Sequence, residues 1–378
     1  GVNDNNVVVG EADNSTGLVV AFVFMNGVTT ELPLLTDGSD ARAWSINNAN
    51  LIVGECRNAA GVSRPVKWEN TGSGWTITDL GTLATGNAGF GVATRVNNAG
   101  QIVGYATADN ALGDPGPYHG CIWNNGGKTD VGTLDFGGNF AYSQLLGINE
   151  NGEATGFAYA VLQGPEHGML TTDRGTLDIT PMEQFGLAQW HNATTSGLLG
   201  GYVSASFTAG EFRPAFYDRN GGGALGNGYT LAPQIVGLPG GYGYDINETG
   251  HLVGTMFYLD ANPDLNIFKG FLSDGLTTVD LTAESTGLPG VFTEARDISN
   301  TGAIVGTAAS DTGPVAVLLT PAVPCAADFN GDDAVTVQDI FDFLAAYFTG
   351  DTAADINGDR NITVQDIFDY LALYFAGC

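Results

Sequence analysis

The C-terminal part of this sequence carries one pattern of oxygen-bearing residues twice, in a segment bounded by Cys325 and Cys378. In each copy Asp, Asn, Asp, Thr and Asp occupy positions 1, 3, 5, 9 and 12 of a short loop. Oxygens at this spacing can surround a hard cation from a single loop, so the pattern predicts two calcium sites. The candidate ligands are Asp328, Asn330, Asp332, Thr336 and Asp339 in the first copy, and Asp355, Asn357, Asp359, Thr363 and Asp366 in the second.

Position 6 of each loop departs from the glycine that this sharp turn usually requires. The two copies carry Asp333 and Arg360 there. Aspartate tolerates a positive φ, whereas arginine costs roughly 1 kcal/mol, so we expect the second site to bind calcium more weakly. Because each loop gathers three aspartates, their repulsion should keep the ion-free module loose, and calcium then contributes to its folding.

Two nearly identical segments with helical periodicity follow the loops, Val337 to Phe348 and Val364 to Phe375. Their apolar stripes contain more aromatic residues than so small a module can bury alone. The stripes are therefore expected to pack within the protein or to face a partner, and the sequence leaves both alternatives open. The stripes are Ile340, Phe343, Leu344, Tyr347 and Phe348, and Ile367, Tyr370, Leu371, Tyr374 and Phe375.

The paired loops resemble those of dockerins, calcium modules that bind cohesins, and the ending Phe375-Ala376-Gly377-Cys378 is similar to that of GC-type dockerin-like modules. The resemblance covers about residues 325–378. It implies that the carbonyl of Ala334 and the side chain of Asn361 complete the two ligand sets. It also implies a cohesin-like or other cell-surface protein as the partner. The duplicated pairs at the implied contact are Val337-Gln338 and Val364-Gln365.

The four cysteines fall into two groups. Cys325 and Cys378 bracket the calcium module, and we expect a disulfide between them that contributes about 4 kcal/mol in the chain-entropy account. Cys56 and Cys121 lie at non-equivalent positions of different repeats, which favours buried free thiols and leaves a bridge between them as the alternative.

A second repeat, with a period near 50 residues, extends from the start of the chain to about Thr320. Its marker is a turn containing Asn or Ser, followed by a strand that ends in glycine seven residues later. The marker asparagines are expected to form the turn itself rather than a repeated metal or sugar site. The copies end at Gly10, Gly54, Gly104, Gly156, Gly254 and Gly306, with a degraded copy ending at Gly201.

Three further strands accompany each marker strand, all short and rich in β-branched and aromatic residues. Four strands per unit at this period predict a mainly β protein, a β-propeller over residues 1–321, followed by a small all-α calcium module at 325–378. The segments amount to 26 strands, two fewer than seven complete blades contain. We therefore predict seven blades with the closing one incomplete, and six as the alternative. Because Gly1-Val2-Asn3 begins inside a marker, we expect a processed or truncated start.

Three segments of this repeat resemble the bacterial extracellular repeat of the HAF family. They are Ile-Asn-x-x-Gly-x-Ile-Val-Gly, His/Arg-x-x-x-Trp and Asp-Leu-Gly-Thr-Leu. The resemblance spans roughly residues 1–320 and implies a secreted propeller with no assigned activity. His119 and His167 occupy one repeat position, which favours a packing role over catalysis.

The composition excludes several classes of function. Acidic residues number 41 against 12 basic ones, and the resulting net charge of −29 repels nucleic acid and anionic lipid. The longest apolar run, Leu18 to Met25, is too short to insert across a bilayer. The four histidines are scattered over separate repeats, and no nucleophile elbow, phosphate-binding loop or Cys-x-x-Cys motif occurs. No catalytic residue is predicted.

Two repeat units are longer than the first two between the marker glycine and the end of the second strand. Gly104 to Trp123 and Gly254 to Ser273 each take 19 residues, where the first two units take 14. Equivalent loops of a propeller lie on one face, so these insertions predict a face that binds a glycan or protein, with drift in loop length as the alternative. The candidate residues are Tyr105, Asp109, Asp114, Tyr118, Tyr258, Asp260, Asp264 and Phe268.

The sequence as a whole favours a secreted or cell-surface, non-catalytic propeller that serves binding, adhesion or surface structure and is tethered by its calcium-dependent module. The alternative is a polysaccharide lyase or glycosidase displayed by the same module. Such an enzyme needs two close carboxylates or a bound ion at the mouth of the propeller, whereas a binding protein needs only a mouth lined by turns.

Overall fold

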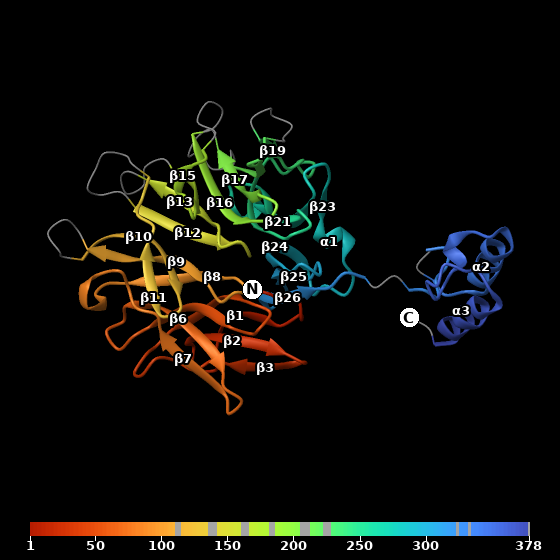
Figure 1. Cartoon of the computed structure of the whole chain (residues 1–378), viewed down its shortest axis with the longest axis horizontal. Coiled ribbons are helices and arrows are strands. Elements are labelled where there is room, and N and C mark those ends of the chain that lie inside the picture. Colours follow the sequence, from red (N-terminus) through yellow and green to blue (C-terminus); the bar gives the residue numbers. More distant parts are fainter. Residues whose placement is uncertain are drawn as a thin grey trace. The chain divides into compact units, whose positions relative to one another are not determined.

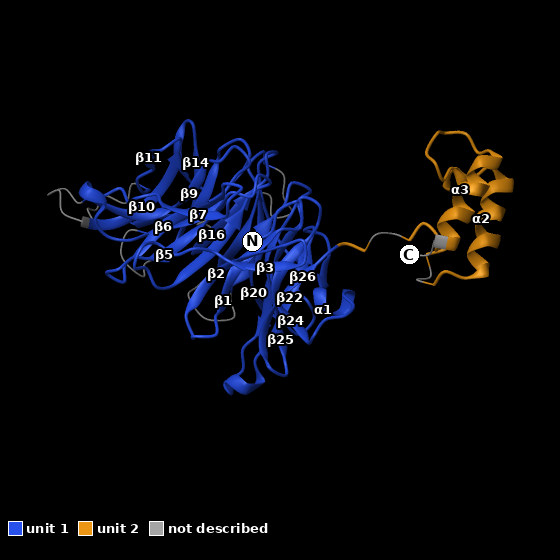
Figure 2. Cartoon of the chain, turned by 90° about the horizontal axis from the view of Figure 1, so that it is seen from below, with its two compact units in different colours: residues 1–320 blue, residues 321–378 orange. Residues whose placement is uncertain are grey.

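The structure, a computed structural model, describes residues 1–109, 115–134, 142–159, 166–180, 186–204, 212–221, 228–322, 325–331 and 334–376. It divides into two compact units, Gly1–Thr320 and Pro321–Cys378, coloured blue and orange in Figure 2. Of the helices in these ranges, none combines the length and the apolar character that a membrane span requires.

The first unit is mainly β and forms a seven-bladed propeller, in which the blades follow one another in chain order (Figure 1). The described residues form 26 strands in seven antiparallel sheets, five with four strands and two with three. The predicted propeller with four-stranded blades is thus confirmed, and the number of blades is seven rather than six. Short helical turns lie in its loops, namely η1 (Thr85–Asn87), η2 (Pro263–Leu265) and α1 (Leu281–Glu284).

The blades are numbered here from one to seven. Blade one contains β1 (Val8–Asp13), β2 (Val19–Met25) and β3 (Val28–Glu31). Blade two contains β4 (Ala41–Ile46), β5 (Ile52–Arg57), β6 (Ser63–Asn70) and β7 (Trp75–Asp79). Blade three contains β8 (Gly91–Val96), β9 (Ile102–Asp109), β10 (Pro115–Asn124) and β11 (Gly127–Asp130). Blades four and five contain β12 (Tyr142–Ile148), β13 (Ala154–Tyr159), β14 (His167–Thr172) and β15 (Gly175–Asp178); and β16 (Leu187–Ala193), β17 (Leu198–Ser204), β18 (Arg213–Asp218) and β19 (Tyr229–Leu231). Blades six and seven contain β20 (Gly240–Ile246), β21 (Leu252–Tyr258), β22 (Ile267–Ser273) and β23 (Thr278–Asp280); and β24 (Val291–Ile298), β25 (Ile304–Ser310) and β26 (Gly313–Leu319).

The first strand of each of blades two to seven is its innermost strand. These strands contact one another in succession around the ring, from β4 to β8, β12, β16, β20 and finally β24. Each continues through the marker turn into the marker strand and pairs with it, as β4 does with β5. A repeat unit counted from its marker therefore ends with the strand that begins the next blade.

The first and last blades each have three strands in the described residues, so the shortfall is divided between two blades instead of falling on one. Val2 and Val8 of blade one pack with Ala303 and Val305 of blade seven in a single apolar cluster. Side-chain packing therefore closes the ring without a strand shared between its two ends.

A β-bulge interrupts each innermost strand at the same place. In β8, Thr94 is an extra residue between the partners of Gly104 and Val103 on β9. A Cβ on Gly104 would stand 2.0 Å from the carbonyl oxygen of Val92, so this position of the marker strand admits only glycine. The marker glycine lets the two backbones approach, and the bulge re-aims one residue of the innermost strand. The same close approach, at 1.8 to 2.1 Å, occurs at Gly54, Gly156, Gly201, Gly254 and Gly306.

The marker asparagines form turns and also join neighbouring blades. Asn47 Oδ1 accepts the backbone N–H groups of Ala49 and Leu51, which is the predicted turn chemistry. Its amide nitrogen donates to the carbonyl of Asn97 in the next blade at 3.0 Å. Equivalent bonds run from Asn3 to Asn47, from Asn97 to Asn149, from Asn149 to Thr194 and from Asn247 to Ser299. Blade seven is joined to blade one by a different hydrogen bond, in which the backbone N–H of Asn300 donates to the side chain of Asp4 at 2.7 Å.

The second unit contains α2 (Val337–Thr349) and α3 (Val364–Ala376), with the short helix η3 (Thr352–Ala354) between them. The stacked rings of Phe343 and Tyr370, with centroids 4.2 Å apart, form its core. Thr336 and Asp339 cap the start of α2 reciprocally, which fixes the end of the first loop against the helix.

Replacing Gly104 with alanine should lower the free energy of unfolding of the propeller by about 3 kcal/mol or more, because the new Cβ meets backbone atoms that cannot yield. Gly10 of β1 offers the matched control, since a Cβ there meets only the ring of Phe22, at 3.1 Å. Urea unfolding followed by tryptophan fluorescence reports the propeller alone, because all five tryptophans lie in residues 1–320. Equal midpoints for the two variants would contradict the close approach.

Candidate functional site

The residue that follows each bulge is buried or nearly so, and in four blades it belongs to one polar network. Arg95 of β8 donates to Asp245 of β20 at 2.7 Å and lies 2.9 Å from Asp297 of β24. Asn192 of β16 donates to Asp245 at 2.9 Å, and the backbone N–H of Val2 donates to Asp297 at 2.7 Å. Because these strands come from different sides of the ring, the network spans the centre of the propeller.

Two carboxyl groups share one guanidinium in this network. Burial raises the pKa of Asp245 to about 8, against the attraction of Arg95. Burial also opposes the ionisation of Asp297, but Arg95 and the hydrogen bonds to this carboxylate hold its pKa below the ordinary value. Burial thus favours the neutral form of Asp245, whereas Arg95 favours the ionised form of Asp297, so the guanidinium is the group that allows carboxylate charge in this network.

The end of the ring that carries the marker turns is a shallow polar depression. Turn residues line most of it, together with Arg95, Asn192 and Asp297 of the central network. The turn residues that contribute an asparagine side chain or backbone are Asn3, Asn47, Asn97, Asn149 and Asn247. Turns therefore line this end, and the amide nitrogens of these asparagines are bonded between blades. Two buried oxygens of the lining, Asn192 Oδ1 and Asp297 Oδ1, have no hydrogen-bond partner among the described residues.

The opposite end of the ring carries the loops that follow the marker strands, such as the loop between β21 and β22. A cavity of about 270 Å³ lies there among blades four, five and six. Its described lining consists of Glu166, Leu187, His191, Tyr202, Phe212, Tyr242 and Tyr244. None of these residues was among the candidates from sequence.

Aromatic rings form most of the cavity wall. The ring of Tyr202 meets those of Phe212 and Tyr242 edge to face, with centroids 5.8 and 4.9 Å apart. Behind them, Tyr242 packs against Phe257 at 5.2 Å, and the Arg296 guanidinium lies 4.6 Å from the centre of the Tyr244 ring. Because neighbouring side chains hold these rings from behind, the wall is formed in advance of any ligand.

His191 is the extra residue of the bulge in β16, as Tyr244 is in β20. Its Nε2 atom is buried and has no hydrogen-bond partner among the described residues. Burial, together with the positive charges of Arg296 and Arg95, lowers the pKa of His191 to about 3, so the ring is neutral at ordinary pH. Glu166 accepts a hydrogen bond from Gln189 at 2.7 Å, and burial raises the pKa of this carboxyl.

The candidate ligand-face residues of blade three lie at the same end as the cavity but outside its lining. The rings of Tyr105 and Tyr118 pack together at 5.4 Å, and Tyr118 meets Tyr142 of blade four at 4.9 Å. Burial raises the pKa of Tyr105 to about 12. Asp109 accepts the backbone N–H of Thr85 at 3.0 Å. These side chains therefore join blade three to its surroundings, and Asp114 lies outside the described residues.

The candidates of blade six bind mainly within their own loop. The hydroxyl of Tyr258 donates to Asp260 at 3.3 Å, and Asp264 lies in η2, where its backbone N–H donates to Asn262. Phe268 is exposed, packs against Phe257 at 6.1 Å and is not part of the cavity lining. The insertions thus decorate the predicted end of the propeller without forming its cavity.

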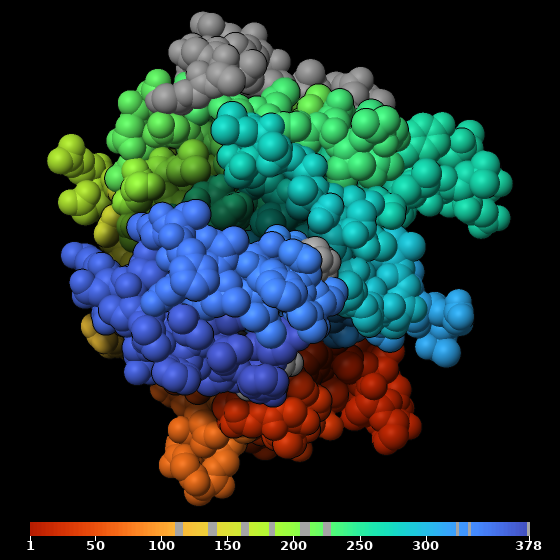
Figure 3. All heavy atoms as spheres, turned by 90° about the vertical axis from the view of Figure 1, so that its right-hand side faces the viewer, coloured from red at the N-terminus to blue at the C-terminus, as the bar shows by residue number. Residues whose placement is uncertain are grey.

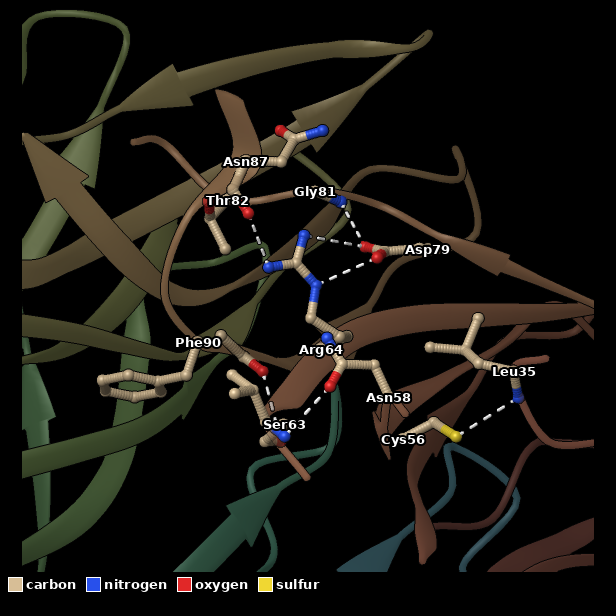
Figure 4. Close-up of polar contacts among 12 residues, drawn as sticks. Leu35, Cys56, Asn58, Ser63, Arg64, Asp79, Gly81, Thr82, Asn87 and Phe90 are labelled. Atoms are coloured by element: carbon tan, nitrogen blue, oxygen red, sulfur yellow. Dashed lines mark hydrogen bonds and ion pairs between the residues drawn. The ribbon is translucent and has the colours of Figure 1, made fainter. Parts of the chain in front are cut away.

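The strand that follows the marker strand carries a basic residue in several blades, and this residue pairs with an aspartate on the next strand. Arg64 donates to Asp79 on the adjacent strand at 2.9 Å and to the carbonyl of Asn87 at 2.8 Å, as Figure 4 shows. The equivalent pairs are His119–Asp130 at 2.9 Å, His167–Asp178 at 2.8 Å and Lys269–Asp280 at 3.1 Å. This repetition supports the structural role expected for the two histidines.

Each calcium-loop sequence is wrapped around its last aspartate. Asp339 is buried and accepts the backbone N–H groups of Asn330 and Thr336, at 3.2 and 2.8 Å. Asp366 is buried in the same way and accepts the N–H of Thr363 at 2.7 Å. Because these backbone hydrogen bonds lower the pKa of both carboxyl groups, the two side chains stay ionised inside their loops.

The other candidate ligands lie around these two aspartates. Asp355 accepts the N–H groups of Asp359 and Arg360, and Arg360 has a φ of 68°, the positive value expected at loop position 6. Among the described residues, no three His, Cys, Asp or Glu side chains converge as a metal cluster. Asp332 and Asp333 lie outside the described residues. The remaining candidates, Asp328, Ala334, Asn357 and Asn361, belong to the described loops.

Cys56 and Cys121 are buried and free, which confirms the favoured interpretation. Burial raises the pKa of both thiols, so they are unreactive core residues. Cys378 lies outside the described residues, and its bridge to Cys325 stays a prediction.

No protein-family model matches the chain, and no curated protein matches it. Among solved structures, puromycin hydrolase and a complex of its mutant align with 85% of this chain and 51% of their own, at 14% identity, with TM-scores of 0.55 and 0.52. The chain thus spans about half the length of these two structures. A mutant of the Aleuria aurantia lectin, complexed with alpha-methyl-L-fucoside, aligns with 85% of this chain and 94% of its own, at 10% identity and a TM-score of 0.33. The likeness to puromycin hydrolase shows the propeller fold alone.

Replacing Arg95 with methionine should lower the free energy of unfolding by about 3–5 kcal/mol at pH 7, because Asp245 and Asp297 lose their positive partner. Both carboxyl groups then have a pKa above the unfolded value, so the loss should grow as the pH rises from about 4 to 8. Asp245→Asn keeps the Arg95–Asp297 pair and should change stability by less than about 1 kcal/mol at pH 7. Urea unfolding of the wild type and of both variants at several pH values checks this. Equal stability of the Arg95→Met and Asp245→Asn variants at pH 8 would contradict the role of Arg95 as the positive partner of both carboxyl groups.

Proposed function

We propose that the second unit binds two calcium ions and attaches the protein to a partner, and that the propeller is a non-catalytic binding module. The buried, ionised carboxylates of Asp339 and Asp366 carry the first part of this proposal. The preformed aromatic cavity carries the second.

The charge of the second unit supports a divalent cation in each loop. Residues 321–378 contain ten aspartates and one arginine, so most carboxylates there have no basic side chain to neutralise them. The donors offered by the loops are all oxygens, which suits calcium. In the first loop Asp328, Asn330, Asp332, Thr336, Asp339 and the Ala334 carbonyl would hold the ion; in the second, Asp355, Asn357, Asp359, Asn361, Thr363 and Asp366. Calcium would supply the positive charge that keeps each loop closed against its helix.

Each helix of this unit exposes the same apolar side chains, which supports attachment to a protein partner. Val337, Phe341 and Phe348 of α2 are 60, 60 and 79% exposed. Their counterparts Val364, Phe368 and Phe375 of α3 are 58, 64 and 80% exposed. The other residues of the predicted stripes pack in the core cluster of the unit, apart from Leu371, which lies outside that cluster. Two copies of one apolar surface fit a partner that could be bound in either of two orientations.

The cavity favours binding over polysaccharide cleavage. A glycosidase needs a pair of carboxyl groups at the reacting bond. The described lining contributes one carboxyl group, Glu166, beside a neutral histidine. A lyase or glycosidase is therefore not proposed.

Isothermal titration of the chelator-treated protein with calcium should show two sites, the weaker one in the loop of Asp355, with a gain of helical circular dichroism. Arg360→Gly should tighten the weaker site about 5- to 10-fold by removing the unfavourable φ. Asp339→Asn and Asp366→Asn should each abolish one site. Absence of calcium binding at millimolar concentration, or a tighter second loop, would contradict the proposal.

The attachment surface can be tested with the cell-envelope fraction of the source organism. Binding should require calcium, fall by less than about twofold in Phe341→Ser or Phe368→Ser, and fall more than tenfold in the double variant. Leu276→Ser supplies the control, because Leu276 is an apolar residue of the propeller that is 84% exposed. If the double variant binds calcium and the envelope fraction as the wild type does, these helices are not the attachment surface.

A further inference from the structure

The cavity of blades four to six is a built site that the binding role alone does not specify. Its volume of about 270 Å³ lies just below the range of roughly 300–1,000 Å³ that is usual for small-molecule sites, so it accepts one small ring and not an extended chain. Tyr202, Phe212, Tyr242 and Tyr244 supply apolar ring surface, and two residues, His191 and Glu166, supply polar groups beside it.

His191 is the group in this cavity that most clearly lacks a partner. The bulge in β16 removes it from the strand ladder and places it in the lining, between the rings of Tyr202 and Tyr244 at 5.6 and 5.9 Å. A buried ring nitrogen without a hydrogen bond costs free energy. Because Nε2 is covered in the unliganded protein, a ligand hydroxyl in the cavity would reach it only after the imidazole turns toward the cavity. Because the neutral ring can donate or accept at Nε2 according to its tautomer, a hydroxyl group suits it well.

The charges around the cavity favour an uncharged ligand. No positively charged side chain belongs to the described lining, and the chain has a net charge of −29, so an anion such as a uronate or phosphate is disfavoured. Arg296 and Arg95 both lower the pKa of His191, so they disfavour a cation beside this ring, whereas Glu166 and the ring faces would attract one. These opposing effects favour an uncharged ligand with hydroxyl groups and an apolar face.

We propose that this cavity binds a single neutral sugar residue, whose C–H face packs on the tyrosine rings and whose hydroxyl groups bond to His191 and Glu166. The inference rests on the proposed binding role of the propeller and names the ligand class of its cavity. The terminal residue of a glycan fits this geometry, since the cavity has room for one ring.

The test uses the full-length protein and the methyl glycosides of glucose, galactose, mannose and fucose as probes, with saturation-transfer NMR and titration. At least one of them should bind, and His191→Phe should weaken that binding more than tenfold while filling the space of the imidazole. Tyr242→Phe, which keeps the ring, should weaken it less. Trp44→Phe is the matched control, because Trp44 is the bulge residue of blade two and lies outside the cavity lining. Tryptophan fluorescence and circular dichroism establish that each variant is folded.

Charged probes complete the test, namely glucuronate, glucosamine and choline, which should bind at least tenfold more weakly than the neutral glycoside. Failure of all four neutral glycosides, preference for a charged probe, or equal affinity of His191→Phe and Trp44→Phe would each overturn the inference. If the neutral glycosides fail while a protein or other ligand is lost in His191→Phe, the binding role survives and only the sugar assignment falls. Calcium-dependent attachment through the second unit is measured separately and does not depend on this result.

Discussion

The close approach of two backbones in every complete blade is the constraint on which the rest of the propeller depends. The innermost strand passes so near the marker strand that a side chain is impossible at the marker glycine, as at Gly104 facing the carbonyl of Val92. An extra residue in the innermost strand accommodates this approach. The bulge re-aims its own residue and buries the one that follows. Repetition of this local geometry around a ring gives a set of side chains that converge on the axis from different blades.

Two different environments arise from this one device. In blades three, six and seven the residues after the bulges are Arg95, Asp245 and Asp297, whose ion pairs join the blades at the centre of the ring. The bulge residues themselves remain available, and in blades five and six they are His191 and Tyr244, which line the cavity. The marker asparagines hold the other end of the ring together through bonds between blades. The propeller is thus rigid where the blades meet, and this rigidity keeps the cavity formed in advance of a ligand. The calcium loops follow another principle, since their carboxylates converge on a charge that the chain itself does not supply.

The architecture follows from the sequence because it depends on spacing. The period near 50 residues, the marker glycines and the strand segments predict seven blades and 26 strands. The two buried free thiols, Cys56 and Cys121, follow from their unequal repeat positions. The bulge is not visible in the sequence, because the extra residue differs in every blade, from Trp44 to His191 to Arg296. The sequence does not predict the cavity either, because His191 is a bulge residue just before the degraded marker copy. The longer insertions indicate Tyr118 and Tyr258 instead. One signal was present, since the Gly-Gly-Tyr-Gly-Tyr run at the start of β20 combines close backbone approach with two half-buried rings. The roles of Asn3 and its counterparts between blades also required the structure, because each bond crosses about 50 residues of sequence.

The ionisation of His191 tests the central claim most directly, namely that the bulge delivers a neutral, unpartnered imidazole into a preformed cavity. NMR of protein labelled with nitrogen-15 in histidine, with His191 assigned by the spectrum of the His191→Phe variant, follows each ring through a pH titration. The account predicts that His191 stays neutral from pH 8 down to pH 5, consistent with a pKa of about 3 caused by burial and the nearby arginines. An imidazole at this position that titrates near the ordinary pKa of about 6.5 would contradict the account, because it would place His191 in solvent or beside a carboxylate.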